Sequence, residues 1–343
     1  MINRHRIAYY DALNIAACFG VISMHANGLT HSFSPTLSWL QAFFVDCVFY
    51  WAVPAFFMLT GATLLDYRKR YETSEFLQRR VVRTLIPFLM WSLIALAIGV
   101  VKGTLAAPVG PRSLVNLILN TGIENVYWFF IPLFAAYLSL PVLSLLSDNT
   151  KALWYLVFVG FFLNVLGPFA CELIGISWNQ SLSLPILGGY LIYVVLGYVL
   201  SRQDLSKAHV RTIYVLGACG LLFRFVLTAH SSFGAGELVK VGWGTTSLPC
   251  FFEAAAVFLL FRRVGGSLSE RFPQAGAALA RLASCSLGVY LVHIFVLRGF
   301  MAATATDYSS VIVRIAGPFL VYAVSLAIVL VLKRVPLLRR LVP

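Results

Sequence analysis

The sequence predicts an all-α fold, a polytopic membrane bundle of about ten transmembrane helices with both termini in the cytoplasm. Composition is the first observation: of 343 residues, 60% are hydrophobic and 11% are charged, against about 25% charged residues in soluble proteins. The second is a series of ten apolar stretches, most close to the ~20 residues that a bilayer crossing needs. The third is a strong asymmetry of Lys and Arg between alternate connections. This composition excludes both a water-soluble enzyme and a disordered chain.

The apolar stretches follow one another with short connections, so we expect a single integral-membrane domain over residues 1–343 and no separate soluble domain. In chain order the predicted helices are roughly 8–29, 41–65, 84–101, 126–147, 152–171, 184–201, 210–229, 245–262, 281–302 and 311–332. The first stretch carries Asp11 and Asn14 and lacks a clean cleavage site, which indicates a retained helix rather than a signal peptide. The longest connection, about 102–125, contains Pro108, Gly110 and Pro111 and is predicted as a loop.

The basic residues indicate which side of the membrane each connection occupies. With both termini inside, the cytoplasmic segments hold twenty Lys and Arg, among them Arg4, Arg6 and the cluster from Arg68 to Arg83. The outer segments hold only five, and Arg224 is left inside the seventh helix. The net charge of +13 therefore reflects membrane topology, and no nucleic-acid partner is expected.

Ionisable side chains inside the apolar stretches are candidates for function, because each costs at least ~2.5 kcal/mol on insertion scales. In chain order they are Asp11, His25, Asp46, Arg224, Glu253 and His293. Structural roles are the alternative: Arg224 with Glu253 or Asp46 would form a helix-orienting ion pair, and His25 or His293 would bond to a neighbouring loop or helix. His25 and Asp46 are expected at similar depth in the outer half, so we predict that Asp46 orients the His25 imidazole.

Five local motifs follow one another along the chain. They are Asp11-Ala-Leu-Asn14 with Met24-His25, Val53-Pro54-Ala-Phe56-Phe57-Met58-Leu-Thr60-Gly61, Arg80-Val-Val-Arg83 before Pro87, Trp128-Phe129-Phe130 with Tyr137 and Pro141, and Ser286-Leu-Gly288-Val-Tyr290-Leu-Val-His293. Each is weak alone, but in this order over ten helices they resemble the acyltransferase-3 family of bacterial membrane acyltransferases. The resemblance spans residues 1 to about 300.

The resemblance implies transfer of an acyl group, usually acetyl from cytoplasmic acetyl-CoA, to a hydroxyl of a cell-surface polysaccharide or its lipid-linked precursor. It also implies a bacterial inner membrane location. His25 matches the family's catalytic histidine, and Arg80 and Arg83 match its cytoplasmic RxxR motif, where guanidinium groups would bind the donor phosphates. No metal is expected, because the six cysteines show neither CxxC nor zinc-type spacing.

The sequence departs from the family pattern at two positions. Position 14 is Asn where the family commonly has Arg or Lys, so Asn14 can donate a hydrogen bond to the donor but cannot neutralise a phosphate. Position 126 is Val where many members have His. The candidate contacts for the glycan or lipid-linked acceptor are Trp128, Tyr127, Glu253, Arg224 and His293.

Two other function classes stay open on the sequence. A flippase or exporter of a lipid-linked saccharide would use His25, Arg224 and Glu253 as a proton or substrate path. An inactive relative acting as a sensor or scaffold would fit the loss of the charge at Asn14. The expected partners are acyl-CoA, the glycan acceptor and the lipid bilayer, and a homo-oligomer stays open.

Overall fold

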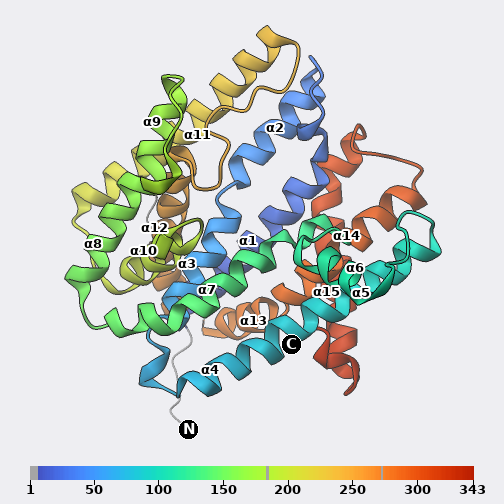
Figure 1. The fold of residues 1–343 in the computed structure, drawn as a ribbon, viewed down its shortest axis with the longest axis horizontal. Coiled ribbons are helices and arrows are strands. Elements are labelled where there is room, and N and C mark those ends of the chain that lie inside the picture. Colours follow the sequence, from blue (N-terminus) through green and yellow to red (C-terminus); the bar gives the residue numbers. More distant parts are fainter. Residues whose placement is uncertain (1–6, 183–184, 272) are drawn as a thin grey trace.

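The computed structural model describes residues 7–182, 185–271 and 273–343, and over these residues the chain is a bundle of α-helices without β-strands (Figure 1). The helices are α1 (Ala8–Ala26), α2 (Leu37–Phe49), α3 (Ala52–Leu64), α4 (Thr73–Arg80), α5 (Ile86–Val101), α6 (Gly110–Leu119), α7 (Phe130–Leu143), α8 (Thr150–Phe161), α9 (Gly167–Leu173), α10 (Leu191–Arg202), α11 (Lys207–Ala235), α12 (Leu248–Arg271), α13 (Pro273–Ala283), α14 (Ser286–Ala303) and α15 (Gly317–Arg334).

Helices occupy all ten predicted stretches, which confirms the all-α polytopic prediction. Within the described ranges, seven helical segments are long and apolar enough to cross a membrane. They are Leu37–Lys69, Thr73–Val101, Asn125–Leu146, Thr150–Leu173, Lys207–Ala235, Ser286–Ala303 and Ile312–Arg334. The other three predicted stretches correspond to α1, α10 and α12. The connection predicted as a loop over 102–125 contains a helix, α6, because Pro111 suits the first turn of a helix and an apolar run follows it.

The sixth predicted helix, 184–201, is shorter in the structure than expected. α10 has 12 residues, or about 18 Å at ~1.5 Å per residue, less than the ~30 Å of a hydrocarbon core. A 3-10 turn, Pro185–Leu187, precedes it, and residues 192–200 are all buried. Non-helical backbone at membrane depth is tolerated where protein surrounds it, so a buried helix can be shorter than its apolar sequence suggests.

α3 and α10 cross at very short range because two glycines meet the opposite backbones. A Cβ at Gly61 would lie 1.7 Å from the carbonyl oxygen of Val194, and one at Gly197 would lie 2.2 Å from that of Met58. Small residues of this kind let membrane helices approach closely and pack by van der Waals contact. The two glycines therefore fix α3 tightly against α10.

Prolines account for the three π-helical turns found in the described chain. The turns are Val81–Leu85, Phe162–Leu166 and Ile312–Ala316, and each ends two residues before a proline, at Pro87, Pro168 and Pro318. Proline lacks an N–H, and its ring clashes with the carbonyl four residues earlier, so a wider turn relieves the contact. One freed carbonyl, that of Arg314, accepts a hydrogen bond from Nδ2 of Asn27 at 3.0 Å. The first of these turns holds Arg83.

The loops predicted for one side of the membrane gather at one end of the bundle. At the inner end, Arg202 pairs with Asp66 and Arg262 pairs with Asp204, each at 2.6 Å, and Lys69 pairs with Asp148. At the outer end, Arg298 pairs with Glu124 at 2.6 Å and Arg314 donates to Gln41 at 2.7 Å. None of these contacts joins a loop predicted inside to one predicted outside. Arg4 and Arg6 lie outside the described residues.

Candidate active site

α1 and α14 lie side by side and run in the same direction, from the inner end outward. Near the inner end, Nδ2 of Asn14 donates to the carbonyl of Ala283, just before α14, at 3.5 Å. One turn further out, Sγ of Cys18 donates to the carbonyl of Ser286 at 3.6 Å. At the outer end of α1, His25 bonds to a residue of α14. Asn14 and His25 are eleven residues apart, or about 16 Å at ~1.5 Å per residue.

The residue that meets His25 is His293, 268 positions away in the chain. Nδ1 of His25 lies 2.7 Å from Nε2 of His293, and Nδ1 of His293 lies 2.5 Å from the carbonyl oxygen of Tyr290. His293 is fully buried, whereas His25 retains some exposed surface. The partly accessible member of the pair is therefore the one on α1.

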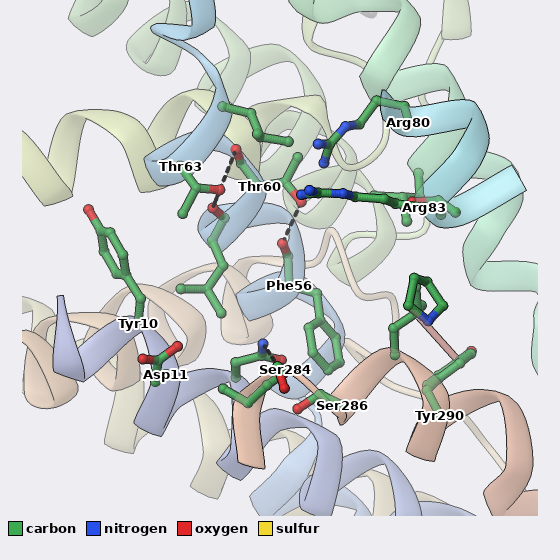
Figure 2. Close-up of a pocket in the computed structure, with 18 of the residues that line it drawn as sticks. Tyr10, Asp11, Phe56, Thr60, Thr63, Arg80, Arg83, Ser284, Ser286 and Tyr290 are labelled. Atoms are coloured by element: carbon green, nitrogen blue, oxygen red, sulfur yellow. Dashed lines mark hydrogen bonds between the residues drawn. The ribbon is translucent and has the colours of Figure 1, made fainter. Parts of the chain in front are cut away.

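A cavity of about 590 Å³ opens at the inner end of the same two helices. That volume is within the ~300–1,000 Å³ typical of small-molecule sites. Its walls come from the start of α1, from α3, from α4 and the π turn after it, from α7, from the start of α14 and from the end of α15. In Figure 2, Arg80 and Arg83 reach into it from one side, while Asp11, Ser284 and Ser286 lie on the opposite side.

Three cations face this cavity, namely Arg80, Arg83 and Lys333. The Arg80 guanidinium lies between two rings, 5.7 Å from the centroid of Phe76 and 5.6 Å from that of Tyr137. Nζ of Lys333 donates to the backbone carbonyl of Ser284 at 2.7 Å, next to the Ala283 carbonyl that Asn14 contacts. Within the described part of the chain, no ion pair joins any of the three to a carboxylate. Asp11 also lines the cavity, so three cations against one acidic side chain leave it with an excess of positive charge, which favours an anionic ligand.

Aromatic rings close the cavity toward the histidine pair. Tyr290 lines the cavity and lies one helical turn before His293, and its ring is 5.5 Å from that of Phe129. Phe56, also in the lining, lies 5.6 Å from Phe129. A second lining residue of α14, Ser286, has a buried hydroxyl without a hydrogen-bond partner. A ligand that filled the cavity would therefore meet the unpaired Ser286 hydroxyl on the inner side of these aromatic rings.

The turn before α7, Asn125–Phe129, is tied to α14 by a reciprocal pair of hydrogen bonds. The Tyr127 hydroxyl donates to the carbonyl of Leu291 at 2.7 Å, and the Tyr290 hydroxyl donates to the carbonyl of Val126. Tyr127 is 1% exposed, so it offers no ring face to a glycan, and the structure gives this predicted acceptor residue a bracing role. Trp128 is half-buried and lies 5.9 Å from the ring of Tyr190.

Arg224 and Glu253 form a buried ion pair between α11 and α12. Nη2 of Arg224 lies 2.9 Å from Oε2 of Glu253 and donates to the carbonyl of Cys47 at 2.6 Å. The same carbonyl accepts only a long hydrogen bond from the Tyr50 N–H, at 3.5 Å, where α2 ends. The geometry is that of the helix-orienting ion pair considered as the alternative for these residues.

Asp46 lies on a different side of α2 from Gln41, the residue that contacts the end of α1. Gln41 on the same helix reaches Asn27 at the end of α1, at 3.2 Å. Asp46, five residues later, is about 140° further round the helix and is an electrostatic neighbour of Arg224. Among the hydrogen bonds between described residues, none joins Asp46 to His25, and the bond predicted for Asp46 is made by His293 instead.

Sequence reasoning placed Arg80, Arg83 and Asn14 at the donor site, and the structure brings all three to one cavity. It missed Lys333, which counted only as part of the positive-inside signal, and it gave no role to Ser286 although the residue begins a quoted motif. Nothing in the local sequence distinguishes Lys333 from the other basic residues of the cytoplasmic loops. Its role follows only from the return of α15 to the start of α1.

Comparison with known proteins identifies the family. The acyltransferase-3 family model, described as an acyltransferase domain, matches residues 7–334. No curated protein matched the chain, and no solved structure did. The family match covers nearly the whole bundle, including the histidine pair and every residue named above for the cavity. The chain therefore belongs to the acyltransferase-3 family and is a multi-pass membrane acyltransferase.

Proposed function

We propose that the protein is an O-acyltransferase of the bacterial inner membrane. It would move an acyl group, acetyl in the first instance, from cytoplasmic acetyl-CoA to a hydroxyl of a cell-surface polysaccharide or its lipid-linked precursor. One observation carries the proposal: two parallel helices, α1 and α14, line a cationic cavity at their inner ends and hold a histidine pair further out.

The donor would bind with its phosphates at the inner end of the cavity. Guanidinium groups bind phosphate through charge-assisted, often bidentate hydrogen bonds, and Arg80 and Arg83 reach the cavity from one helix (Figure 2). Lys333 approaches from α15, next to Asn14. It would supply the positive charge that Asn14 lacks, so the departure at position 14 does not by itself argue for an inactive relative.

The acyl end of the donor would extend outward along α14. Ser286, Tyr290 and His293 are spaced at i, i+4 and i+7, so they share one face of that helix. The pantetheine arm would pass Ser286, whose hydroxyl has no partner, and the thioester would reach the histidine pair once the rings beside Tyr290 admit it. This arrangement would join a donor on the cytoplasmic side to an acceptor on the other side.

The chemical step would use His25 as the base. His25 accepts the proton of the acceptor hydroxyl while the oxygen attacks the thioester carbonyl carbon. The C–S bond then breaks, and the thiolate of coenzyme A takes the proton from the His25 imidazolium. The products are an acyl ester and free coenzyme A, and no redox or metal step is needed to balance the reaction.

The deciding experiment measures free thiol released from acetyl-CoA by the purified protein in detergent. Wild type and His25→Ala are compared with His230→Ala, which changes an exposed histidine of α11. We expect slow donor hydrolysis that His25→Ala abolishes and His230→Ala leaves intact. If wild type neither releases thiol nor binds coenzyme A, the proposal fails, and the flippase and scaffold alternatives are then separated by a liposome transport assay without any acyl donor.

A further inference from the structure

The two histidine rings meet edge to edge. Their planes differ by 8° and their centroids are 5.0 Å apart, while the two bonded nitrogens are 2.7 Å apart. Face-to-face stacking at this centroid distance would leave no pair of ring atoms so close. The N···N line must therefore run almost along the line between the centroids, in the plane of both rings. An imidazole N–H and an imidazole lone pair both lie in the ring plane, so this is a well-aligned hydrogen bond.

The hydrogen-bond chain fixes which nitrogen carries each proton. The carbonyl of Tyr290 can only accept, so Nδ1 of His293, 2.5 Å away, must carry a hydrogen. His293 is fully buried, and no ion pair or hydrogen bond in the described chain joins it to a carboxylate. A buried cation without a partner is strongly disfavoured, so His293 is neutral and its Nε2 carries a lone pair.

That lone pair determines which ring nitrogen of His25 carries the hydrogen. Because Nε2 of His293 can only accept, Nδ1 of His25 must donate across the 2.7 Å contact. The second nitrogen of neutral His25, Nε2, then holds the free lone pair and points away from His293. We infer that His293 is a positioning residue that selects the Nδ1–H tautomer of His25 and directs Nε2 toward the reacting hydroxyl.

The surroundings of His293 keep its ring in place. The carbonyl that accepts from its Nδ1 belongs to Tyr290, whose own hydroxyl donates to Val126. Tyr127 donates to the carbonyl of Leu291, between Tyr290 and His293. The turn before α7 therefore braces the part of α14 that holds His293. When His25 takes up a proton, its Nδ1–H stays bonded to the His293 lone pair, which stabilises the imidazolium during the step.

This inference rests on the proposed function for its catalytic meaning, while the tautomer is a property of the resting protein. It is tested first by NMR of protein labelled with ¹⁵N-histidine, in which the signals of His25 are identified by their loss in His25→Ala. We expect wild-type His25 to be protonated at Nδ1 and unprotonated at Nε2. His293→Leu roughly keeps the size of the side chain but removes the nitrogen that accepts from His25. In this variant His25 should shift toward the Nε2–H form. Wild-type His25 with its hydrogen on Nε2 would overturn the inference.

The second test is kinetic and uses two replacements of His293 with one control. Loss of the positioned tautomer should lower kcat in His293→Leu by about 100-fold or more, the range of general-base contributions, with the donor KM unchanged. His293→Gln restores an acceptor oxygen near the place of Nε2 and should recover most of this loss. His230→Leu is the matched control on an exposed helix face. If the kcat of His293→Gln is no higher than that of His293→Leu, His293 has only a packing role.

The two proposals fail in different ways. If wild type neither releases thiol nor binds coenzyme A, the proposed function is refuted, and the NMR experiment still decides the tautomer. If His25→Ala is inactive but His293→Leu keeps the wild-type kcat, the acyltransferase mechanism stands and the positioning role is wrong. A raised donor KM with unchanged kcat in His293→Leu would also contradict the inference, because His293 lies outside the donor cavity.

Discussion

Removal of a single cavity arginine should weaken donor binding according to how buried its guanidinium is. Arg80 is half-buried between Phe76 and Tyr137, and charge-assisted hydrogen bonds contribute about 1.5–3 kcal/mol. For Arg80→Ala we expect a loss of about 2–3 kcal/mol, a 30- to 150-fold rise in the donor KM. Arg83 is more exposed, so water screens its contact and Arg83→Ala should raise the KM by only about tenfold.

Arg79 provides the matched control for both variants. It precedes Arg80 on α4, but it pairs with Glu75 at 2.5 Å and does not line the cavity. The assay is thiol release titrated with acetyl-CoA, combined with calorimetric binding of coenzyme A, at low and at moderate salt. Arg80→Ala should change the donor KM and its salt dependence, while acceptor KM stays near wild type. Equal effects of Arg79→Ala and Arg80→Ala would refute a specific anion site.

Three further changes test other parts of the structure. Lys333→Gln should raise the donor KM by about tenfold, the lower end for a charge-assisted contact, and adding Asn14→Lys should restore it in the same titration. Gly61→Ala should lower the melting temperature and yield because its Cβ would strike a backbone carbonyl at 1.7 Å, whereas Gly234→Ala, in open space on α11, should not. Asp46→Asn should keep kcat within about threefold of wild type, against the 100-fold or greater effect of losing a base; a loss of that size would restore Asp46 as the orienting residue.

The sequence carries strong information on where the helices lie and on which loops share an end of the bundle, and the structure agrees with both. Hydropathy places ten helices, the positive-inside rule sorts their loops, and the spacing of Arg80 and Arg83 predicts a shared face. The two arginines do line one cavity. These inferences succeed because they depend on distance along a helix, which the sequence gives directly at ~1.5 Å per residue.

Direction around a helix axis and the choice of neighbours are not encoded in the same local way. The predicted depths placed Asp46 in the outer half with His25 and placed His293 nearer the middle of the membrane, so depth favoured Asp46 as the partner of His25. Packing decides otherwise, since α14 returns from 268 residues away to lie beside α1. Lys333 and the short, buried α10 were missed for the same reason: their roles come from long-range packing, which hydropathy does not report.

In the proposed function, the parallel course of α1 and α14 would let one bundle serve reactants on two sides of a membrane. A soluble acyltransferase can place donor, base and acceptor in one cleft, whereas here the cations lie at the inner end and His25 lies about 16 Å further out, by ~1.5 Å per residue. Two adjacent helices that both run outward keep this spacing fixed, because each contact along them, at Asn14, Cys18 and His25, sets the register of the next. In the proposed function the length of the donor itself would bridge this separation, and the aromatic rings beside Tyr290 would close the route when no donor fills it.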